Sequence, residues 1–212
     1  HLEYTTQGGR PTSGYFPRFR NLKTQETDFL RGYAAGFSAS RGVGPDTSGI
    51  GMDLKNSLLN PDKYGPWRVG SHMMGETIPK ETNFVALDPN QKDEWGMPQL
   101  RISVDYDDND EKMVKDYIEQ MTEMFTKAGF TNIQSADSKQ APGLDIHEMG
   151  GVRMGKDPKT SLLNANHQLH AVPNVYVTDG ASMTSTSTQN PSLTYMAFAA
   201  RAAHHAVAES KK

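Results

Sequence analysis

The imidazole of His147 stands in a run of residues that could receive a ligand. It is followed by Glu148 and Met149 and then by Gly150 and Gly151, so the backbone beside the imidazole carries little side-chain bulk. Glycines of this kind let a ligand, or another stretch of backbone, approach closely. Taken alone, the run is also what a tight turn would need.

Asn190, immediately before Pro191, is the second candidate. Proline suits the first position of a helix, and the Ala-rich stretch behind it (SLTYMAFAARAAHHAVAES) is long enough for about five helical turns. The first amide groups of a helix are unpaired and its dipole is positive there, so the Asn190 side chain would lie at a helix mouth that attracts an anion. The alternative is that Asn190 only caps this helix.

The remaining histidines and a glycine-rich run are weaker candidates. His167 and His170 stand three residues apart in a turn-rich region without the helix of a zinc site, so we expect surface or packing roles for them. His204 and His205, near the end of the last predicted helix, are expected to be solvated. The run 42–51 has neither the GxGxxG spacing nor the Lys-Ser/Thr pair of a nucleotide-binding loop.

The elements that must position these residues are clearest after residue 76. Residues 83–87 and 98–106 read as two strands, the second with alternating apolar side chains, and the turn residues between them favour an antiparallel pair. An apolar stripe with three- and four-residue steps predicts a helix that ends at Gly129. The stripe is Met113, Val114, Tyr117, Ile118, Met121, Met124, Phe125 and Ala128, and we interpret it as core.

Two further elements are predicted on either side of this region. Residues 174–179 (NVYVTD) form a compact β-branched strand that ends in Asp179 and Gly180, followed by a loop rich in Ser and Thr. Near the start, residues 28–37 are a candidate for a short helix, and loops dominate the rest of the chain up to about residue 70.

Composition excludes several classes of protein. A net charge of -3 argues against a nucleic-acid-binding surface, and no apolar run is long enough for a transmembrane helix. The absence of cysteine excludes disulfides and thiolate metal sites and gives no clue to the compartment, which stays open. Because the chain begins in polar sequence without Met, we expect a fragment of a longer protein.

Three runs, taken together and in this order, resemble the C-terminal signature of the glucose-methanol-choline (GMC) oxidoreductases, which are FAD-dependent. They are HEMGGVRMG (147–155), NVYVTDGASM (174–183) and TQNPSLTYMAFAARAAHHAV (188–207). The His-x-x-Gly-Gly form with a later Asn-Pro is most similar to the cholesterol oxidase and sugar dehydrogenase branches. The resemblance extends back through residues 75–102, which are similar to the family's substrate-domain strands, and more weakly to FPRFRN (16–21) and DFLRGY (28–33).

The resemblance implies an α+β fold, with an antiparallel sheet and helices in a substrate-domain region (1–145). The C-terminal segment (146–212) would contribute a strand, loop and helix that complete a Rossmann-like FAD domain. The N-terminal part of that domain, with its GxGxxG loop, is absent from this sequence and would be the chain's partner, supplied by a missing front half or by another polypeptide. The free segment could also pair with a second copy as a homo-oligomer.

The resemblance also implies roles for individual residues. His147 would take the proton of a substrate hydroxyl, and Asn190 would bind and orient the substrate oxygen. Unpaired amides at Pro191 and Ser192 would face the negative charge of the reduced flavin. The strand end at Asp179, Gly180 and Ala181 would lie near the flavin's ribityl and pyrophosphate groups.

The expected function is therefore oxidation of CH–OH groups of a sugar, polyol or other alcohol, with hydride transfer to FAD. Two alternatives are a non-catalytic carbohydrate-binding module and a metal-dependent hydrolase that uses His147, His167 and His170. Candidates for substrate contacts are Glu76, Trp95, Arg101 and Tyr106, which could equally be structural.

Overall fold

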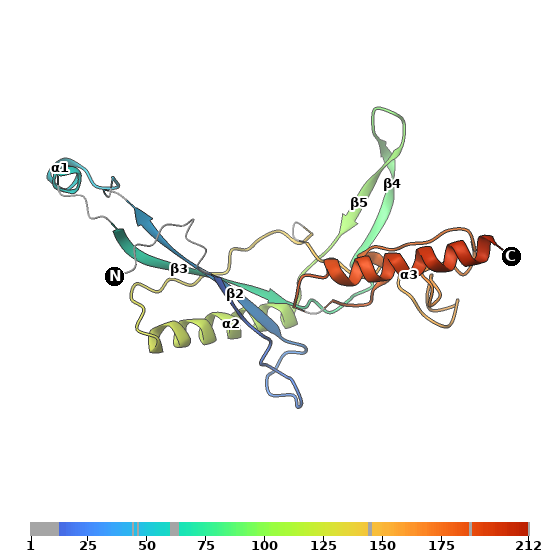
Figure 1. The fold of residues 1–212 in the computed structure, drawn as a ribbon, viewed down its shortest axis with the longest axis horizontal. Helices are drawn as coiled ribbons and strands as arrows, with labels where there is room; N and C mark the ends of the chain where they lie inside the picture. The colour runs from blue at the N-terminus through green and yellow to red at the C-terminus, as the bar shows by residue number, and fades with distance from the viewer. Residues whose placement is uncertain are drawn as a thin grey trace. The chain divides into compact units, whose positions relative to one another are not determined.

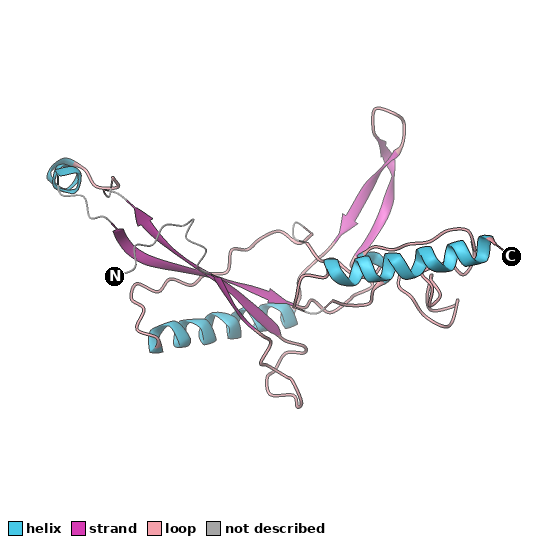
Figure 2. Cartoon of the chain, viewed as in Figure 1, coloured by secondary structure: helices cyan, strands magenta, loops and turns pink. Residues whose placement is uncertain are grey.

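A computed structural model describes residues 13–43, 45, 47–59, 64–143, 146–186 and 188–211. Figures 1 and 2 show its helices and strands. The chain divides into two compact units, one up to Gly75 and one from Glu76. Within the described residues the class is α+β, as predicted, with two small antiparallel sheets and three α-helices. Two residues of the glycine-rich run 42–51, 44 and 46, lie outside the described part. This division by contacts differs from the division by function between residues 145 and 146, which stays a prediction.

The first unit contains a three-stranded antiparallel sheet in the order β1-β2-β3. Its strands are β1 (Ser13–Phe16), β2 (Tyr33–Val43) and β3 (Tyr64–Gly75), and helix α1 (Gly51–Leu59) connects β2 to β3. The predicted helix over 28–37 is therefore wrong, because Tyr33 onward pairs in β2 with strands on both sides. The expectation that loops dominate this region is wrong for the same reason.

A glycine in β2 shows how pairing overrides local preference. Gly36 stands opposite His72 of β3, and a Cβ on Gly36 would lie 2.5 Å from the imidazole ring. The ring covers the place of the missing side chain, which compensates for the poor strand propensity of glycine. Such a contact between residues 36 positions apart has no local sequence signal.

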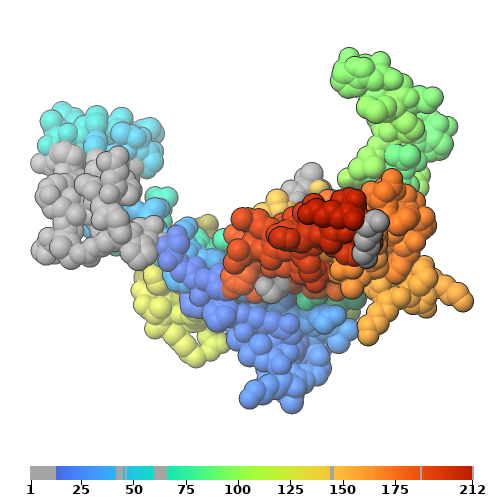
Figure 3. Space-filling model, turned by 45° about the vertical axis from the view of Figure 1, so that its right-hand side comes forward, coloured from blue at the N-terminus to red at the C-terminus, as the bar shows by residue number. Residues whose placement is uncertain are grey.

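The second unit begins with a hairpin of β4 (Phe84–Lys92) and β5 (Pro98–Ser103), which confirms the predicted antiparallel pair. The register places Val85 opposite Ile102 and Leu87 opposite Leu100. These four apolar side chains are each more than half exposed. Figures 1 and 3 show the hairpin, in green, standing clear of the rest of its unit.

Helix α2 (Asp108–Lys127) confirms the helix predicted from the apolar stripe, and Met113 and Met121 of that stripe are buried. Its start is a capping box, in which Asp107 accepts from the first turn and the Asp110 carboxylate accepts from the Asp107 N–H. The helix ends at Lys127 with Ala128 as its C-cap, and Gly129, with φ +85°, follows at the terminating position where the sequence predicts a glycine. The capping side chains fix the start of α2 independently of its packing.

The predicted strand over 174–179 is wrong. Tyr176 forms an isolated antiparallel bridge with Gln168, and the described structure has no longer ladder there. Two backbone bonds flank this bridge, from the N–H of Val177 to the His167 carbonyl and from the N–H of Leu169 to the Val175 carbonyl. A β-branched run becomes a strand when another strand pairs along its length, and here the pairing is limited to this one bridge. Completion of a Rossmann-like domain by this segment stays a prediction.

The described chain ends in helix α3 (Ser192–Ser210), coloured red at the surface of the space-filling view (Figure 3). Ala202 is the buried residue of this helix, whereas Leu193, Met196 and Val207 are more than half exposed. The described helices include none with the length and apolar composition that a bilayer crossing requires.

Candidate active site

The glycine-rich segment after His147 runs beside the turn that follows residues 174–179. The N–H of Val152 donates to the carbonyl of Ala181 at 3.1 Å, and the N–H of Met154 donates to the carbonyl of Ser182 at 3.0 Å. These backbone bonds bring the first two motifs, which are about 30 residues apart in sequence, into direct contact.

The third motif joins them through α3. A Cβ built on Gly180 would lie 2.9 Å from the Tyr195 hydroxyl oxygen and 3.1 Å from both the Glu148 carbonyl oxygen and the Met149 sulfur. The Tyr195 hydroxyl also donates to Met149 Sδ at 3.7 Å. Segments containing His147, Gly180 and the first turn of α3 therefore meet at one place. The space left by the missing side chain of Gly180 is therefore occupied by atoms of Tyr195, Glu148 and Met149.

His147 itself is half-buried and has a left-handed backbone, with φ +72°. Gly150 and Gly151 also have positive φ angles, and the N–H of Val152 closes a turn onto the Gly150 carbonyl at 2.8 Å. Apart from the adjacent residues in the chain, none of the described residues has an atom within 4 Å of a Cβ built on either glycine. The segment is thus the tight turn considered from the sequence, and the space beside its glycines is open to a ligand.

The start of α3 differs from the prediction. The helix begins at Ser192, and Pro191 occupies the cap position with φ -91° and without a side-chain cap. Asn190 is exposed and lies before the cap, so its predicted role as N-cap and the predicted helix start at Pro191 are both wrong. Because proline has no side-chain acceptor, the first amides of α3, including that of Ser192, receive no cap from this residue.

Asp179 has a local structural role. Its carboxylate accepts from the N–H of Ala181 at 2.9 Å and so caps the short 3₁₀ turn Gly180–Ser182. The hydroxyl of Ser182, which is fully buried, donates to the Asp179 carbonyl at 2.8 Å. These bonds hold the turn that contacts the His147 segment.

Tyr195 lies in a negative electrostatic environment. Burial raises the pKa of its phenol, and the carboxylates of Asp179 and Glu148 raise it further. The phenol therefore keeps its proton at neutral pH, which suits its role as a donor to the Met149 sulfur. Sequence analysis missed Tyr195, whose signal was its place on the α3 face that includes Phe198 and Arg201 at steps of three.

His167 and His170 have the packing roles expected from the sequence. His167 is fully buried between the Val177 carbonyl and Arg201, and His170 bonds Ser161 Oγ and the Gly155 carbonyl, each at 3.2 Å. The described residues contain no group of three side chains that could hold a metal ion. His204 is exposed as predicted, while His205 is half-buried against Tyr176, a partly incorrect prediction.

The candidate substrate contacts lie on separate segments. Glu76 accepts from the Ser185 hydroxyl at 2.7 Å, and Arg101 of β5 lies over the Phe84 ring at 5.3 Å. Trp95, at the hairpin turn, is 75% exposed, and Tyr106 is half exposed. Glu76 is thus linked to the Ser- and Thr-rich loop before Asn190, whereas Arg101 packs within its own hairpin.

Neither the side chain of His147 nor that of Asn190 makes a hydrogen bond within the described part of the chain. Their meeting at a substrate oxygen stays a prediction. The same holds for flavin contacts of Asp179, Gly180, Ala181, Pro191 and Ser192.

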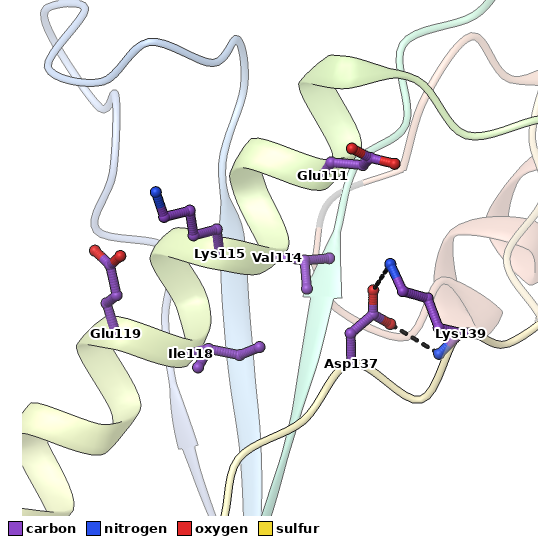
Figure 4. Close-up of a pocket in the computed structure, with 7 residues that line it drawn as sticks. All are labelled: Glu111, Val114, Lys115, Ile118, Glu119, Asp137 and Lys139. Carbon is purple, nitrogen blue, oxygen red and sulfur yellow. Dashed lines mark hydrogen bonds and ion pairs between the residues drawn. The ribbon is translucent and has the colours of Figure 1, made fainter.

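A hollow of about 340 Å³ lies beside α2 (Figure 4). Glu111, Lys115 and Glu119 of the helix line it, together with the ion pair of Asp137 and Lys139. Hydrogen bonds from Lys139 lower the pKa of the Asp137 carboxyl, so the two charges of this pair neutralise each other. The lining alternates in charge and shares no residue with the three motifs.

Comparison with known proteins agrees with the three motifs. Residues 79–199 match the sequence model of a family described as GMC oxidoreductase. The chain is 32% identical to 2-methyl-1,2-propanediol dehydrogenase of Mycolicibacterium austroafricanum over 185 residues, which cover 83% of this chain and 33% of that protein.

Two other relatives match shorter parts. Gluconate 2-dehydrogenase flavoprotein of Pantoea cypripedii is 38% identical over 108 residues (47% of this chain and 17% of the relative). Cholesterol oxidase of Mycobacterium tuberculosis is 38% identical over 60 residues (28% of this chain and 10% of the relative). The chain thus spans a third or less of the length of these relatives. Because the family match covers more than half of the sequence and includes all or most of each motif, the chain belongs to the GMC oxidoreductase family.

Proposed function

We propose that this chain carries the catalytic His and Asn of an FAD-dependent oxidoreductase that acts on CH–OH groups of a sugar, polyol or other alcohol. The observation that carries the proposal is the junction of the three motifs, where Val152 bonds Ala181 and Tyr195 packs over Gly180. The relatives' names, a diol dehydrogenase and a gluconate dehydrogenase flavoprotein among them, support the substrate class.

In this proposal His147 is the general base. A neutral imidazole with a free ring nitrogen can accept the proton of a bound hydroxyl. The left-handed backbone at His147 and the open space beside Gly150 and Gly151 favour a substrate or cofactor close to the ring. The exposed amide of Asn190 can hydrogen-bond the same substrate oxygen and orient it toward the imidazole.

The residues present fit the isoalloxazine end of FAD, which when bound supplies the hydride acceptor. The first amides of α3, uncapped by Pro191, provide partial positive charge without a cationic side chain. The sequence has no GxGxxG loop, so we propose that residues outside it hold the adenosine end and that the active enzyme includes such a flavin-binding part.

The proposal is tested with His147→Asn in the complete flavin-loaded protein, because asparagine tolerates the left-handed backbone that His147 adopts. We expect the rate of flavin reduction by sugars or polyols to fall about 10²- to 10⁴-fold, the usual contribution of a general base. His204→Asn, on the exposed surface of α3, is the matched control and should leave the rate unchanged.

The visible spectrum of bound flavin is recorded first for both variants, so that loss of the cofactor is separated from loss of the base. An unchanged reduction rate in a flavin-loaded His147→Asn variant would show that His147 is not the base. Sugar binding without flavin reduction in the unmodified protein would favour the alternative, a non-catalytic carbohydrate-binding module.

A further inference from the structure

His167 is a fully buried imidazole with two opposite hydrogen-bond partners. Its Nδ1 lies 3.1 Å from the Val177 carbonyl oxygen, and its Nε2 lies 3.1 Å from Nη2 of Arg201. A carbonyl can only accept and a guanidinium can only donate, so Nδ1 must carry the proton and Nε2 must be the acceptor. The two partners therefore define one neutral tautomer.

The imidazole and its partner Arg201 together join three segments of the second unit. Arg201 and Phe198 belong to α3, and the Phe198 ring lies 4.9 Å from that of His167. Arg201 stacks over Phe198 at 5.0 Å and also donates to Met154 Sδ at 3.7 Å. Met154 is in the segment that follows His147, and Val177 directly precedes the turn at Asp179. His167 thus ties α3 to the second motif, and its partner Arg201 adds the contact to the first.

We infer that His167 is a positioning residue whose neutral imidazole latches α3 to these segments, and that its protonation opens the latch. A proton on Nε2 removes the acceptor that Arg201 uses and places two cations 3.1 Å apart. Its effect on the reaction rests on the proposed function, because α3 begins beside Asn190 and Met154 follows the His147 segment. The latch itself does not depend on that function.

The surroundings of the ring oppose its charged form. Burial lowers the pKa of His167, and the charge of Arg201 lowers it further, although the Val177 carbonyl acts in the opposite direction. Arg201 is the charged group that faces the ring among the described residues, since Phe198 and Val177 present an aromatic face and a backbone oxygen. Of the neighbouring imidazoles, His170 bonds Ser161, and His205 lies against Tyr176.

The first test uses the unmodified full-length protein and nitrogen NMR of its histidine rings. We expect His167 to be the neutral Nδ1–H tautomer at pH 7 and to gain its second proton at a lower pH than a free imidazole. A neutral Nε2–H tautomer, or a charged ring at pH 7, would overturn the inference. Because no substitution is involved, this result does not depend on the folding of a variant.

The second test is hydrogen exchange of α3 between pH 8 and pH 5, corrected for the intrinsic pH dependence of exchange. We expect protection around Phe198 and Arg201 to fall by up to about tenfold per pH unit as the pH drops below about 6.5, the ordinary value, and to level off once the pKa of the latched ring is passed, as linkage requires. His167→Gln keeps one donor and one acceptor but cannot gain a proton, so its protection should stay constant. His170→Gln, the matched control, should lose protection as the unmodified protein does.

Arg201→Leu completes the design, since it removes the donor and should lower α3 protection already at pH 7. The inference is overturned if protection in the unmodified protein does not change with pH, or if His167→Gln shows the same fall. Neither result bears on the oxidoreductase proposal, which depends on flavin reduction by the His147 variant. A protein could therefore have the latch without the activity, or the activity without the latch.

Discussion

Gly180 lies directly beneath the side chain of Tyr195, with the place of its missing Cβ only 2.9 Å from the phenolic oxygen. The relationship joins the turn after residues 174–179 to the first turn of α3. The Glu148 carbonyl, 3.1 Å from the same place, adds the segment that follows His147. The distance between three motifs is therefore set by the absence of one side chain.

We expect Gly180→Ala to destabilise the protein by about 1–3 kcal/mol, the usual cost of adding a methyl group to a closely packed site. The Tyr195 hydroxyl is the end of a side chain and can move, but the Glu148 oxygen belongs to the backbone. The free energy of unfolding in urea measures this cost. Flavin reduction should also slow, since the motifs would separate.

Tyr195→Phe provides the control for that prediction, because it removes the oxygen nearest to the new methyl group. The double variant Gly180→Ala with Tyr195→Phe should be destabilised by less than the sum of the two single variants. Strictly additive effects would contradict the idea that the hydroxyl and the Cβ compete for the same space.

Asn190→Ala separates a structural role from a functional one. Loss of an N-cap costs about 1 kcal/mol, but the cap position of α3 is occupied by Pro191 and Asn190 is exposed. We therefore expect the melting temperature to stay unchanged while flavin reduction slows. Thermal unfolding and single-turnover kinetics of the same sample provide both values, and loss of stability with unaltered kinetics would show that Asn190 is only structural.

The elements that sequence analysis predicted correctly are those whose signal is local. Alternating apolar residues around Leu100 and Ile102 indicated β5, and the stripe that includes Met113 and Met121 indicated α2. Both patterns repeat within a few residues and match the period of the element. The glycine at the end of α2 was likewise readable, because a left-handed residue there favours glycine.

The failed predictions of a helix over 28–37 and a strand over 174–179 concern backbone pairing that no local pattern in the sequence shows. The strand β2 is held by partners such as His72 opposite Gly36, and its Ala- and Gly-containing sequence resembles a helix locally. The run around Tyr176 has strand propensity, but in the described structure its backbone bonds to the preceding loop. The three motifs of the site could be predicted from their resemblance to a family. Tyr195 and Arg201 could not, because the Ala-rich sequence of α3 does not show which of its faces packs against the rest of the unit.

Gly129→Ala should weaken the end of α2. Gly129 has φ +85°, and its amide and that of Phe130 bond the carbonyls of Thr126 and Phe125. Apart from its chain neighbours, the described part of the chain has no atom within 4 Å of a Cβ built there, so the cost is one of backbone conformation, about 1 kcal/mol. Gly129→Asn is the matched control, since asparagine tolerates this conformation, and it should lose clearly less stability in urea unfolding.

The stability of the protein should also depend on His167 in acid. The pKa of the folded-state imidazole is lowered, so below about pH 6.5, the ordinary value, the unfolded chain binds the proton more readily than the folded one. Proton binding by His167 therefore leaves the free energy of unfolding unchanged at higher pH. As the pH falls below the ordinary value, it lowers the free energy of unfolding more and more, until the folded-state pKa is passed.

His167→Gln removes this titration while keeping a donor for Val177 and an acceptor for Arg201. The difference in unfolding free energy between the variant and the unmodified protein should be constant from pH 8 to pH 7 and should then shift in favour of the variant toward pH 5. His170→Gln, with its partners Ser161 and Gly155, serves as the comparison for a half-buried imidazole. Two parallel pH profiles for His167→Gln and the unmodified protein would mean that the buried ring keeps its ordinary proton affinity, and that Arg201 does not oppose its charge.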